Sequence, residues 1–130
     1  EAVLMHAVER LALHPVLTNI QTSWVKMGPE GVKVCLESGA NDLGGTLINE
    51  SISTSAGAQY GQLVGPAELH RLIRDAGRIP AQRDTLYGIV RTYSEGESPE
   101  SPLDKIEDAE ARFGSYRRLI ASGEFRFTRG

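Results

Sequence analysis

The residues able to do chemistry gather around a pair of glycines, Gly44 and Gly45. Amide, carboxylate and hydroxyl side chains flank this pair, at Asn41, Asp42, Thr46, Asn49, Glu50, Ser51 and Ser53. A glycine pair lets the backbone approach a ligand closely and exposes N–H groups for hydrogen bonds. The pattern predicts a strand, a polar glycine loop and a helix, the arrangement in which α/β proteins place ligands. A structural turn that caps a helix and binds nothing explains the same residues equally well.

A second polar group lies in residues 19–27, which are rich in β-branched and aromatic side chains and are interpreted as a strand. Alternation places Ile20, Thr22 and Trp24 on one face, and Gln21 and Ser23 on the other. A strand packed beneath helices is apolar on both faces. Gln21 and Ser23 therefore indicate a wet or ligand-facing side near the end of the strand, although an edge strand with one solvated face fits as well.

Composition excludes several classes of function. The net charge of −3 argues against a nucleic-acid-binding face, which needs a basic surplus. No apolar run approaches the roughly 20 residues that span a bilayer, and no secretory signal is visible, so we expect a cytoplasmic protein with no membrane partner. Cys35 is the only cysteine, which leaves no disulfide and no cysteine cluster for a metal, and we expect it to be a small core residue.

The elements that must position these residues follow from apolar periodicity and from Gly and Pro. We expect helices over residues 1–14, from Gly28-Pro29 to Gly39, near residues 51–58, and from Gly65-Pro66 to Gly77, with a second strand over residues 40–43. The last of these helices should bury Leu69, Leu72, Ile73 and Ala76 and expose His70. The short connections predict parallel β/α units. The first helix has no start signal, so we expect the chain to be part of a longer protein.

The C-terminal part has a different organisation. Residues 80–87 show no clear period, although Arg83 and Tyr87 provide polar groups there. Residues 94–103 are rich in Pro, Ser and acid and indicate a linker. A helix over residues 104–121 and a terminal strand over residues 124–128 should follow it. The expected organisation is therefore a main unit (1–93), a linker (94–103) and a helical extension (104–130).

Three motifs carry a resemblance to a known family. They are Asn19-Ile-Gln-Thr-Ser-Trp-Val-Lys-Met-Gly28, Gly39-Ala-Asn-Asp-Leu-Gly-Gly-Thr46 with Asn49-Glu-Ser-Ile-Ser53, and Arg78-Ile-Pro-Ala-Gln-Arg-Asp-Thr-Leu-Tyr87. Over about residues 1–88 the chain resembles the C-terminal half of radical S-adenosylmethionine enzymes, in the group that contains the tyrosine-using subunit of deazaflavin (FO) synthase. Related enzymes of the menaquinone (futalosine) route share a similar Asn-Asp-Leu-Gly-Gly-Thr signature.

The resemblance implies an α/β fold, the C-terminal portion of a (β/α) partial TIM-type barrel with extra C-terminal helices. It implies an N-terminal barrel half whose Cys-x3-Cys-x2-Cys motif holds a [4Fe–4S] cluster that cleaves S-adenosylmethionine to a radical. In FO synthase this radical acts on tyrosine, and a hydroxybenzyl fragment is joined to 5-amino-6-(D-ribitylamino)uracil. It also implies a substrate wall made of Gln21, Ser23, Asn41, Asp42, Thr46, Asn49 and Glu50 around the Gly44-Gly45 loop, while no catalytic residue is assigned.

One departure limits what this chain does alone. A single cysteine cannot supply the three thiolates of such a cluster, so the chain by itself should hold no cofactor and be inactive. Three interpretations stay open: part of an FO synthase, part of a menaquinone-route enzyme, or a non-catalytic binding module. Exposed strand edges of a half barrel favour pairing, so a homo-oligomer of the fragment is a further expectation.

Overall fold

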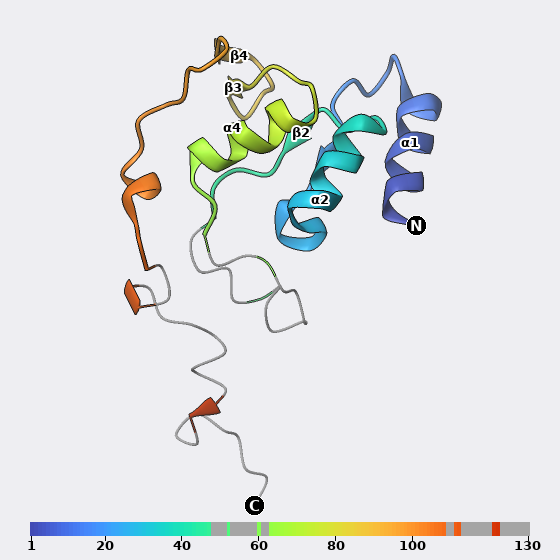
Figure 1. Ribbon diagram of the computed structural model, residues 1–130. Helices are drawn as coiled ribbons and strands as arrows, with labels where there is room; N and C mark the ends of the chain where they lie inside the picture. The colour runs from blue at the N-terminus through green and yellow to red at the C-terminus, as the bar shows by residue number, and fades with distance from the viewer. Residues whose placement is uncertain (48–51, 53–59, 61–62, 109–110, 113–120, 123–130) are drawn as a thin grey trace, which may run out of the picture.

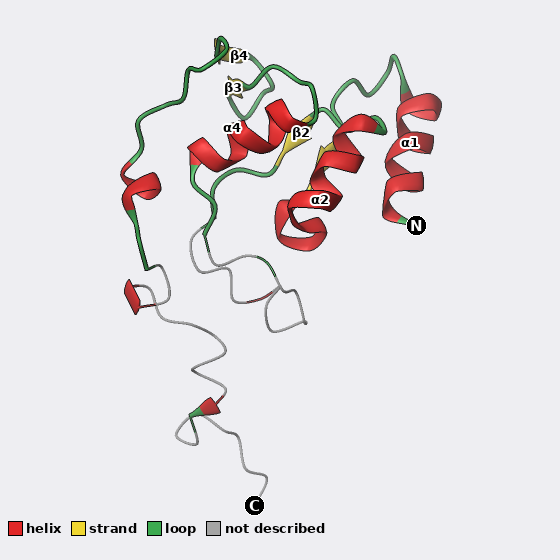
Figure 2. Cartoon of the chain, viewed as in Figure 1, coloured by secondary structure: helices red, strands yellow, loops and turns green. Residues whose placement is uncertain are grey.

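The computed structural model describes residues 1–47, 52, 60, 63–108, 111–112 and 121–122 (Figure 1). Short strands and helices alternate in the first half of the chain, and a hairpin and a 3-10 helix follow (Figure 2). The elements are α1 (Ala2–Leu13), β1 (Gln21–Thr22), α2 (Trp24–Glu37), β2 (Asp42–Leu43), α4 (Pro66–Asp75), β3 (Ala81–Arg83), β4 (Ile89–Thr92) and η1 (Pro102–Lys105).

A parallel β/α unit holds the first half together. β1 pairs with β2 in parallel, with Gln21 opposite Asp42 and Thr22 opposite Leu43. The helix α2 connects the two strands, as parallel pairing requires a long crossover. The predicted parallel β/α arrangement is therefore confirmed for this unit.

The expected strand over residues 19–27 is confirmed only at Gln21–Thr22, and it is wrong beyond Thr22 because helix α2 begins at Trp24. Ser23 is the extended residue before the helix, and its carbonyl accepts a hydrogen bond from Met27 N at 3.0 Å. The neighbours Trp24 and Val25 are then both buried, which an alternating strand does not allow. The aromatic and β-branched residues that suggested a strand serve here as the apolar face of a helix.

A kink divides α2 where the sequence predicted a helix start. Gly28 adopts φ 66° and ψ 174°, a left-handed φ that favours glycine, and Pro29 opens the second stretch of the helix. An added Cβ at Gly28 would lie 2.5 Å from the ring of Tyr60. The predicted end of the helix is confirmed, because Ser38 is its last cap residue and Gly39 follows with φ 127°.

The core lies where α2 packs against α4. Its buried residues are Trp24, Val25, Val32, Cys35, Leu36, Ala40, Leu72 and Ala76, with Val3, Leu69 and Ile73 partly buried against them. Cys35 has no exposed surface and is a core residue, as predicted. The expectation for His70 is wrong, because only 8% of its surface is exposed. The hairpin residue Tyr93 packs on its ring and covers it, which the local period could not show.

Helix α1 forms over the predicted residues but leaves its apolar stripe largely uncovered. Leu4, Val8 and Leu11 are 68%, 53% and 84% exposed. Only the inner side of α1 contacts α2, and Val3 packs against the core from there. Within the described part of the chain, nothing covers the outer stripe of α1.

The C-terminal half contains a hairpin that the sequence did not reveal. β3 and β4 are antiparallel, with Ala81 opposite Thr92 and an irregularity between Gln82 and Arg83. Asp84 closes the turn, since its Oδ1 accepts hydrogen bonds from the backbone N–H groups of Leu86 and Gly88, both at 2.8 Å. The strands are too short, and one is too irregular, to show an alternating period.

The expected helix does not begin at Asp104. Pro102–Lys105 is a 3-10 helix, and Ile106–Asp108 is not helical. Asp104 instead caps α4, because its Oδ1 accepts a hydrogen bond from Ala67 N at 3.1 Å. Residues 111–112 and 121 are helical, and the rest of the expected helix lies outside the described residues, as does the expected strand over residues 124–128. The helix expected near residues 51–58 also lies outside them, except for Ile52.

Candidate functional site

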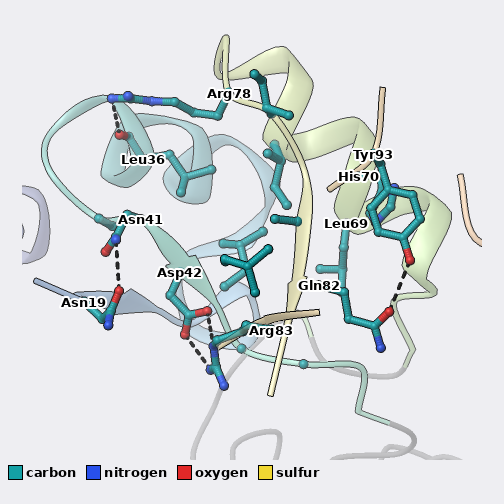
Figure 3. A pocket seen from close by; sticks show the side chains of 18 of the residues that line it. Asn19, Leu36, Asn41, Asp42, Leu69, His70, Arg78, Gln82, Arg83 and Tyr93 are labelled. Carbon is teal, nitrogen blue, oxygen red and sulfur yellow. Dashed lines mark hydrogen bonds and ion pairs between the residues drawn. The ribbon is translucent and has the colours of Figure 1, made fainter. Parts of the chain in front are cut away.

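The strongest polar contact near the glycine pair joins Asp42 on β2 to Arg83 on β3. Arg83 donates from Nε to Oδ1 of Asp42 at 2.7 Å and from Nη2 to Oδ2 at 2.8 Å (Figure 3). Gln21 lies opposite Asp42 in the parallel register and donates to Oδ2 at 2.7 Å. The Asp42 side chain is 12% exposed and that of Arg83 is 27% exposed. A two-pronged bond of this kind fixes the orientation of both groups.

Arg83 is held from several directions. Its Nη1 donates to the carbonyl of Asp84 at 3.0 Å, and its guanidinium lies 4.2 Å from the centre of the Tyr87 ring. The hydrogen bond to Asp42 raises the pKa of Arg83 above its ordinary value. Arg83 is therefore a fixed cation, and Asp42 is its counter-ion rather than a free base.

Asn41 fastens the start of β2 to the start of β1. Its Oδ1 accepts from Ile20 N at 2.8 Å and from Nη2 of Arg10 at 3.0 Å, and its Nδ2 donates to Oδ1 of Asn19 at 3.3 Å. Arg10 also donates to the carbonyls of Gly39 and Thr18, both at 2.9 Å. The amide of Asn41 is thus committed within the chain, and its role here is to set the register of the two strands.

The glycine loop leaves β2 with open space around it. Gly44 N donates to the carbonyl of Thr22 at 3.2 Å, and the indole of Trp24 donates to the carbonyl of Gly45 at 3.1 Å. An added Cβ at Gly44 or Gly45 would meet no described atom within 4 Å. Crowding within the described chain therefore does not explain the pair. Thr46 is exposed beside them.

A pocket of about 1010 Å³ brings five of the nine predicted site residues together: Asn41, Asp42, Gly44, Gly45 and Thr46. Gln21 and Ser23 do not line it. Gln21 instead donates a hydrogen bond to Asp42. Ser23 directly precedes α2, and its side chain makes no capping hydrogen bond to the helix. Asn49 and Glu50 lie outside the described residues.

Several residues that line the pocket were not identified from the sequence. They come from α1, α4, the hairpin and the segments that flank the hairpin: Arg10, Leu69, His70, Ile73, Arg78, Gln82 and Tyr93. Arg83 and Tyr87 had been noted only as polar groups. Arg78 is anchored by a hydrogen bond from Nη2 to the carbonyl of Leu36 at 3.3 Å. No local pattern marks these residues, because they converge only when the hairpin folds over α4 and β2.

We call Asp42 and Arg83 the charged side of the pocket, and His70, Gln82 and Tyr93 the neutral side (Figure 3). On the neutral side the rings of His70 and Tyr93 meet edge to face, 4.4 Å between centres at 61°. Tyr93 donates its hydroxyl to Oε1 of Gln82 at 3.2 Å. Burial lowers the pKa of His70, so its imidazole is neutral near pH 7.

The residues present do not fit an iron–sulfur cluster. The described part of the chain has no group of three or more His, Cys, Asp or Glu placed to hold a metal ion. Cys35, the single cysteine of the sequence, is enclosed between helices. In the same described part, no helix is both long enough and apolar enough to cross a membrane.

Comparison with known proteins gives one family match, which covers residues 1–96 and is described as the CofH/MqnC C-terminal region. Among curated proteins, a 5-amino-6-(D-ribitylamino)uracil–L-tyrosine 4-hydroxyphenyl transferase of Archaeoglobus fulgidus is 56% identical over 88 residues, 68% of this chain and 26% of that protein. The enzyme of the same name from Methanopyrus kandleri is 52% identical over 91 residues, 70% of this chain and 25% of that protein.

A third relative, the transferase 2 of that name from Methanosarcina mazei, is 45% identical over 97 residues, 75% of this chain and 25% of that protein. The chain therefore spans about a quarter of the length of these relatives. No solved structure gives a significant match. The matched segment contains the whole β1–α2–β2 unit, α4 and the hairpin, and so both sides of the pocket.

Proposed function

The chain belongs to the family described as the CofH/MqnC C-terminal region, and on that premise we propose that it is the substrate-facing C-terminal part of an FO synthase tyrosine-using subunit. The full-length enzyme would join a hydroxybenzyl fragment of tyrosine to 5-amino-6-(D-ribitylamino)uracil. The names of relatives at 45–56% identity support this reaction. The alternative is an enzyme of the menaquinone route. Such an enzyme would belong to the same family, but none of these three relatives is named as one.

The proposal rests on an ion pair between two distant motifs. Asp42 in the glycine-loop motif and Arg83 in the Arg78–Tyr87 motif are 41 residues apart, and they meet in a bidentate ion pair at the wall of one pocket. Two motifs of one resemblance thus build one site. A non-catalytic binding module would need a pocket too, but it gives no reason for these two motifs to occur together.

We propose that the chain contributes the last β/α units of a partial TIM-type barrel. The parallel β1–α2–β2 unit supports this, because two-stranded parallel sheets are normally buried by further strands and helices. Asp42 and the Gly44-Gly45 loop lie at the carboxyl end of β2, where barrel enzymes place substrate-binding groups. The exposed stripe of α1 would pack against the N-terminal barrel half in the full-length protein.

Within this proposal, residues 1–93 form the barrel portion, and residues 94–103 lead to an extension over residues 104–130. The S-adenosylmethionine and the [4Fe–4S] cluster belong to the N-terminal half, which would lie in the same cytoplasmic protein. When bound there, they supply the radical. A homo-oligomer would form through exposed strand edges and α1 only when the chain is separated from that half.

The residues of this chain would bind, orient and shield the substrates. Arg83 is a fixed cation that already holds the Asp42 carboxylate, so it is suited to orient Asp42 toward a hydroxyl or amine of a substrate. The open space at Gly44 and Gly45 leaves room for a ligand to approach the backbone. A pocket of about 1010 Å³ is large enough for more than one small molecule.

The test uses the full-length protein that contains this region, reconstituted anaerobically with iron and sulfide. Incubation with S-adenosylmethionine, a reductant, tyrosine and 5-amino-6-(D-ribitylamino)uracil should give a product that contains both carbon skeletons, detected by mass spectrometry with ring-labelled tyrosine. The matched control omits the uracil compound. Cleavage of S-adenosylmethionine without this product would favour the menaquinone-route alternative, and no cleavage at all would favour a non-catalytic module.

A further inference from the structure

Residues 94–104, which we call the strap, run from the end of the hairpin along helix α4 (Figure 1). Near the C-terminal end of α4, Arg74 donates from Nη2 to two backbone carbonyls at the start of the strap. At the opposite end of α4, Oδ1 of Asp104 accepts a hydrogen bond from Ala67 N at 3.1 Å and caps the helix. The strap is therefore fastened to α4 at both of its ends.

The fastening at Asp104 depends on Gly65, the residue that precedes α4. An added Cβ at Gly65 would overlap Oδ1 of Asp104. Gly65 has φ −78° and ψ 165°, which other residues also adopt, so the close approach of Asp104 is what requires a glycine here. The family match ends at residue 96, so a glycine within the matched segment makes room for a side chain beyond it.

Between its two fastenings the strap forms part of the pocket wall, through Pro99, Glu100 and Ser101. Pro99 and Ser101 are half-buried, and Oγ of Ser101 accepts a hydrogen bond from Leu103 N at 3.2 Å. Pro99 and Pro102 restrict the backbone on either side. Glu100 thus extends from a constrained stretch of backbone, and its own side chain is exposed at the pocket.

Two carboxylates line the pocket in the described part of the chain, and they differ in their partners. Asp42 is held by Arg83, whereas Glu100 has no ion pair or hydrogen bond with any described residue. The other arginines of the wall, Arg10 and Arg78, donate to carbonyl oxygens elsewhere. The Glu100 carboxylate is therefore free to receive a cationic N–H donor from a ligand.

We propose that the strap is a substrate-binding element, in which the Glu100 carboxylate accepts a hydrogen bond from the ammonium group of an amino acid bound in the pocket. The fastenings at Arg74 and Asp104 position this carboxylate. The inference rests on the proposed function, which supplies tyrosine as the amino acid. The other substrate, 5-amino-6-(D-ribitylamino)uracil, has no ammonium group, so Glu100 distinguishes the two substrates by charge.

The test compares the binding of tyrosine and of 3-(4-hydroxyphenyl)propionate, which is tyrosine without its ammonium group, to the full-length protein by calorimetry. The unmodified protein should bind tyrosine about tenfold more tightly, as expected for one hydrogen bond between charged groups. Glu100→Gln keeps the size of the side chain and removes its charge. It should weaken tyrosine about tenfold and leave the propionate unchanged, so that the preference disappears.

Glu95→Gln is the matched control, because Glu95 is an exposed acid of the strap that does not line the pocket, and it should bind both ligands as the unmodified protein does. Gly65→Ala adds a methyl group against Asp104, outside the pocket wall, and should weaken tyrosine more than the propionate.

Three results would overturn the assignment to Glu100 and leave the proposed function standing. They are equal binding of tyrosine and the propionate by the unmodified protein, unchanged tyrosine binding by Glu100→Gln, and equal weakening of both ligands by this variant. An unmodified protein that binds neither tyrosine nor 5-amino-6-(D-ribitylamino)uracil would contradict the proposed function as well.

Discussion

The polar groups on the two sides of the pocket differ in whether their hydrogen bonds are satisfied. On the charged side, Asp42 receives hydrogen bonds from Arg83 and Gln21, and Arg83 has a second partner in Asp84. On the neutral side, His70 keeps one ring nitrogen without a partner among the described residues. A satisfied group holds the wall in shape, whereas a buried unsatisfied group costs free energy. Hydrogen-bond satisfaction thus separates the ion pair of the charged side from the buried imidazole of the neutral side.

The charged side is also where the family motifs meet, whereas the neutral side depends on the segment that follows β4. Tyr93 packs on the imidazole there, and Arg74 donates to the carbonyls of Ser94 and Glu97 in that segment. The family match ends at residue 96, within this same segment. The following predictions test whether the two sides differ as described.

The largest effect should come from Asp42→Ala in the full-length enzyme. Without the carboxylate, Arg83 loses both of its strongest hydrogen bonds and its orientation. Displacement of a positioning group by about 1 Å can cost roughly a hundredfold in rate, and we expect a loss of product formation of that order. Since the proposed function assigns the cluster to the N-terminal half, the visible absorbance of the cluster should stay unchanged. Unchanged turnover would show that Asp42 has no role at the substrate.

The second effect concerns the geometry of the ion pair between Asp42 and Arg83 rather than its charge. Arg83→Lys keeps a cation opposite Asp42 but cannot make the two parallel bonds. We expect the free energy of unfolding to fall by about 1.5–3 kcal/mol, the range for hydrogen bonds that involve charged groups. Urea denaturation followed by tryptophan fluorescence measures it. A stability equal to that of the unmodified protein would mean that the two-pronged contact does not hold the hairpin on β2.

The third effect is a dependence of stability on pH from the neutral side. Burial lowers the pKa of His70 below its ordinary value of 6.5, against the opposing influence of Glu97 and Asp104 and with the support of Arg74. The contribution of neutral His70 is fully present above pH 6.5 and is lost as the pH falls through the lowered pKa, because the unfolded chain takes up the proton first. The unfolding midpoint of the His70→Phe variant should change less between pH 7 and about pH 5 than that of the unmodified protein. An unchanged pH profile in this variant would contradict the burial of a neutral ring.

A smaller effect should follow from Tyr93→Phe, which keeps the ring on His70 and removes the hydroxyl that binds Gln82. We expect stability to fall by about 0.5–1.5 kcal/mol, the net value of a single neutral hydrogen bond. Urea denaturation measures this change. A stability equal to that of the unmodified protein would mean that the hydrogen bond to Gln82 adds nothing to the fold.

The smallest effect is expected outside both sides of the pocket. Arg71→Gln removes exposed ion pairs to Glu68 and Asp75, and surface pairs of this kind contribute little. Neither the unfolding midpoint nor product formation should change measurably. A clear loss of activity would mean that the outer face of α4 contacts another part of the enzyme.

Local patterns in the sequence determined several elements and the family of this protein. Pro66 marks a helix start, Pro29 opens the second stretch of α2, Gly39 and Gly77 follow helix ends, and α1 and α4 form over the expected residues. These features are readable because capping and helical periodicity join residues three or four positions apart. The glycine-loop motif was found for the same reason, as a dense run of polar residues.

Which of these residues work together depends on contacts between distant segments of the folded chain. The partner of Asp42 is 41 residues away on a hairpin that shows no period, and no spacing rule encodes that distance. The burial of His70 depends on Tyr93, and the cap of α4 depends on Asp104, which the helical pattern had assigned to another helix. Trp24 and Val25 were read as a strand because propensity cannot tell a buried helix from a buried strand over so few residues. Side chains acquire partners through packing between distant segments, and packing is a property of the folded chain.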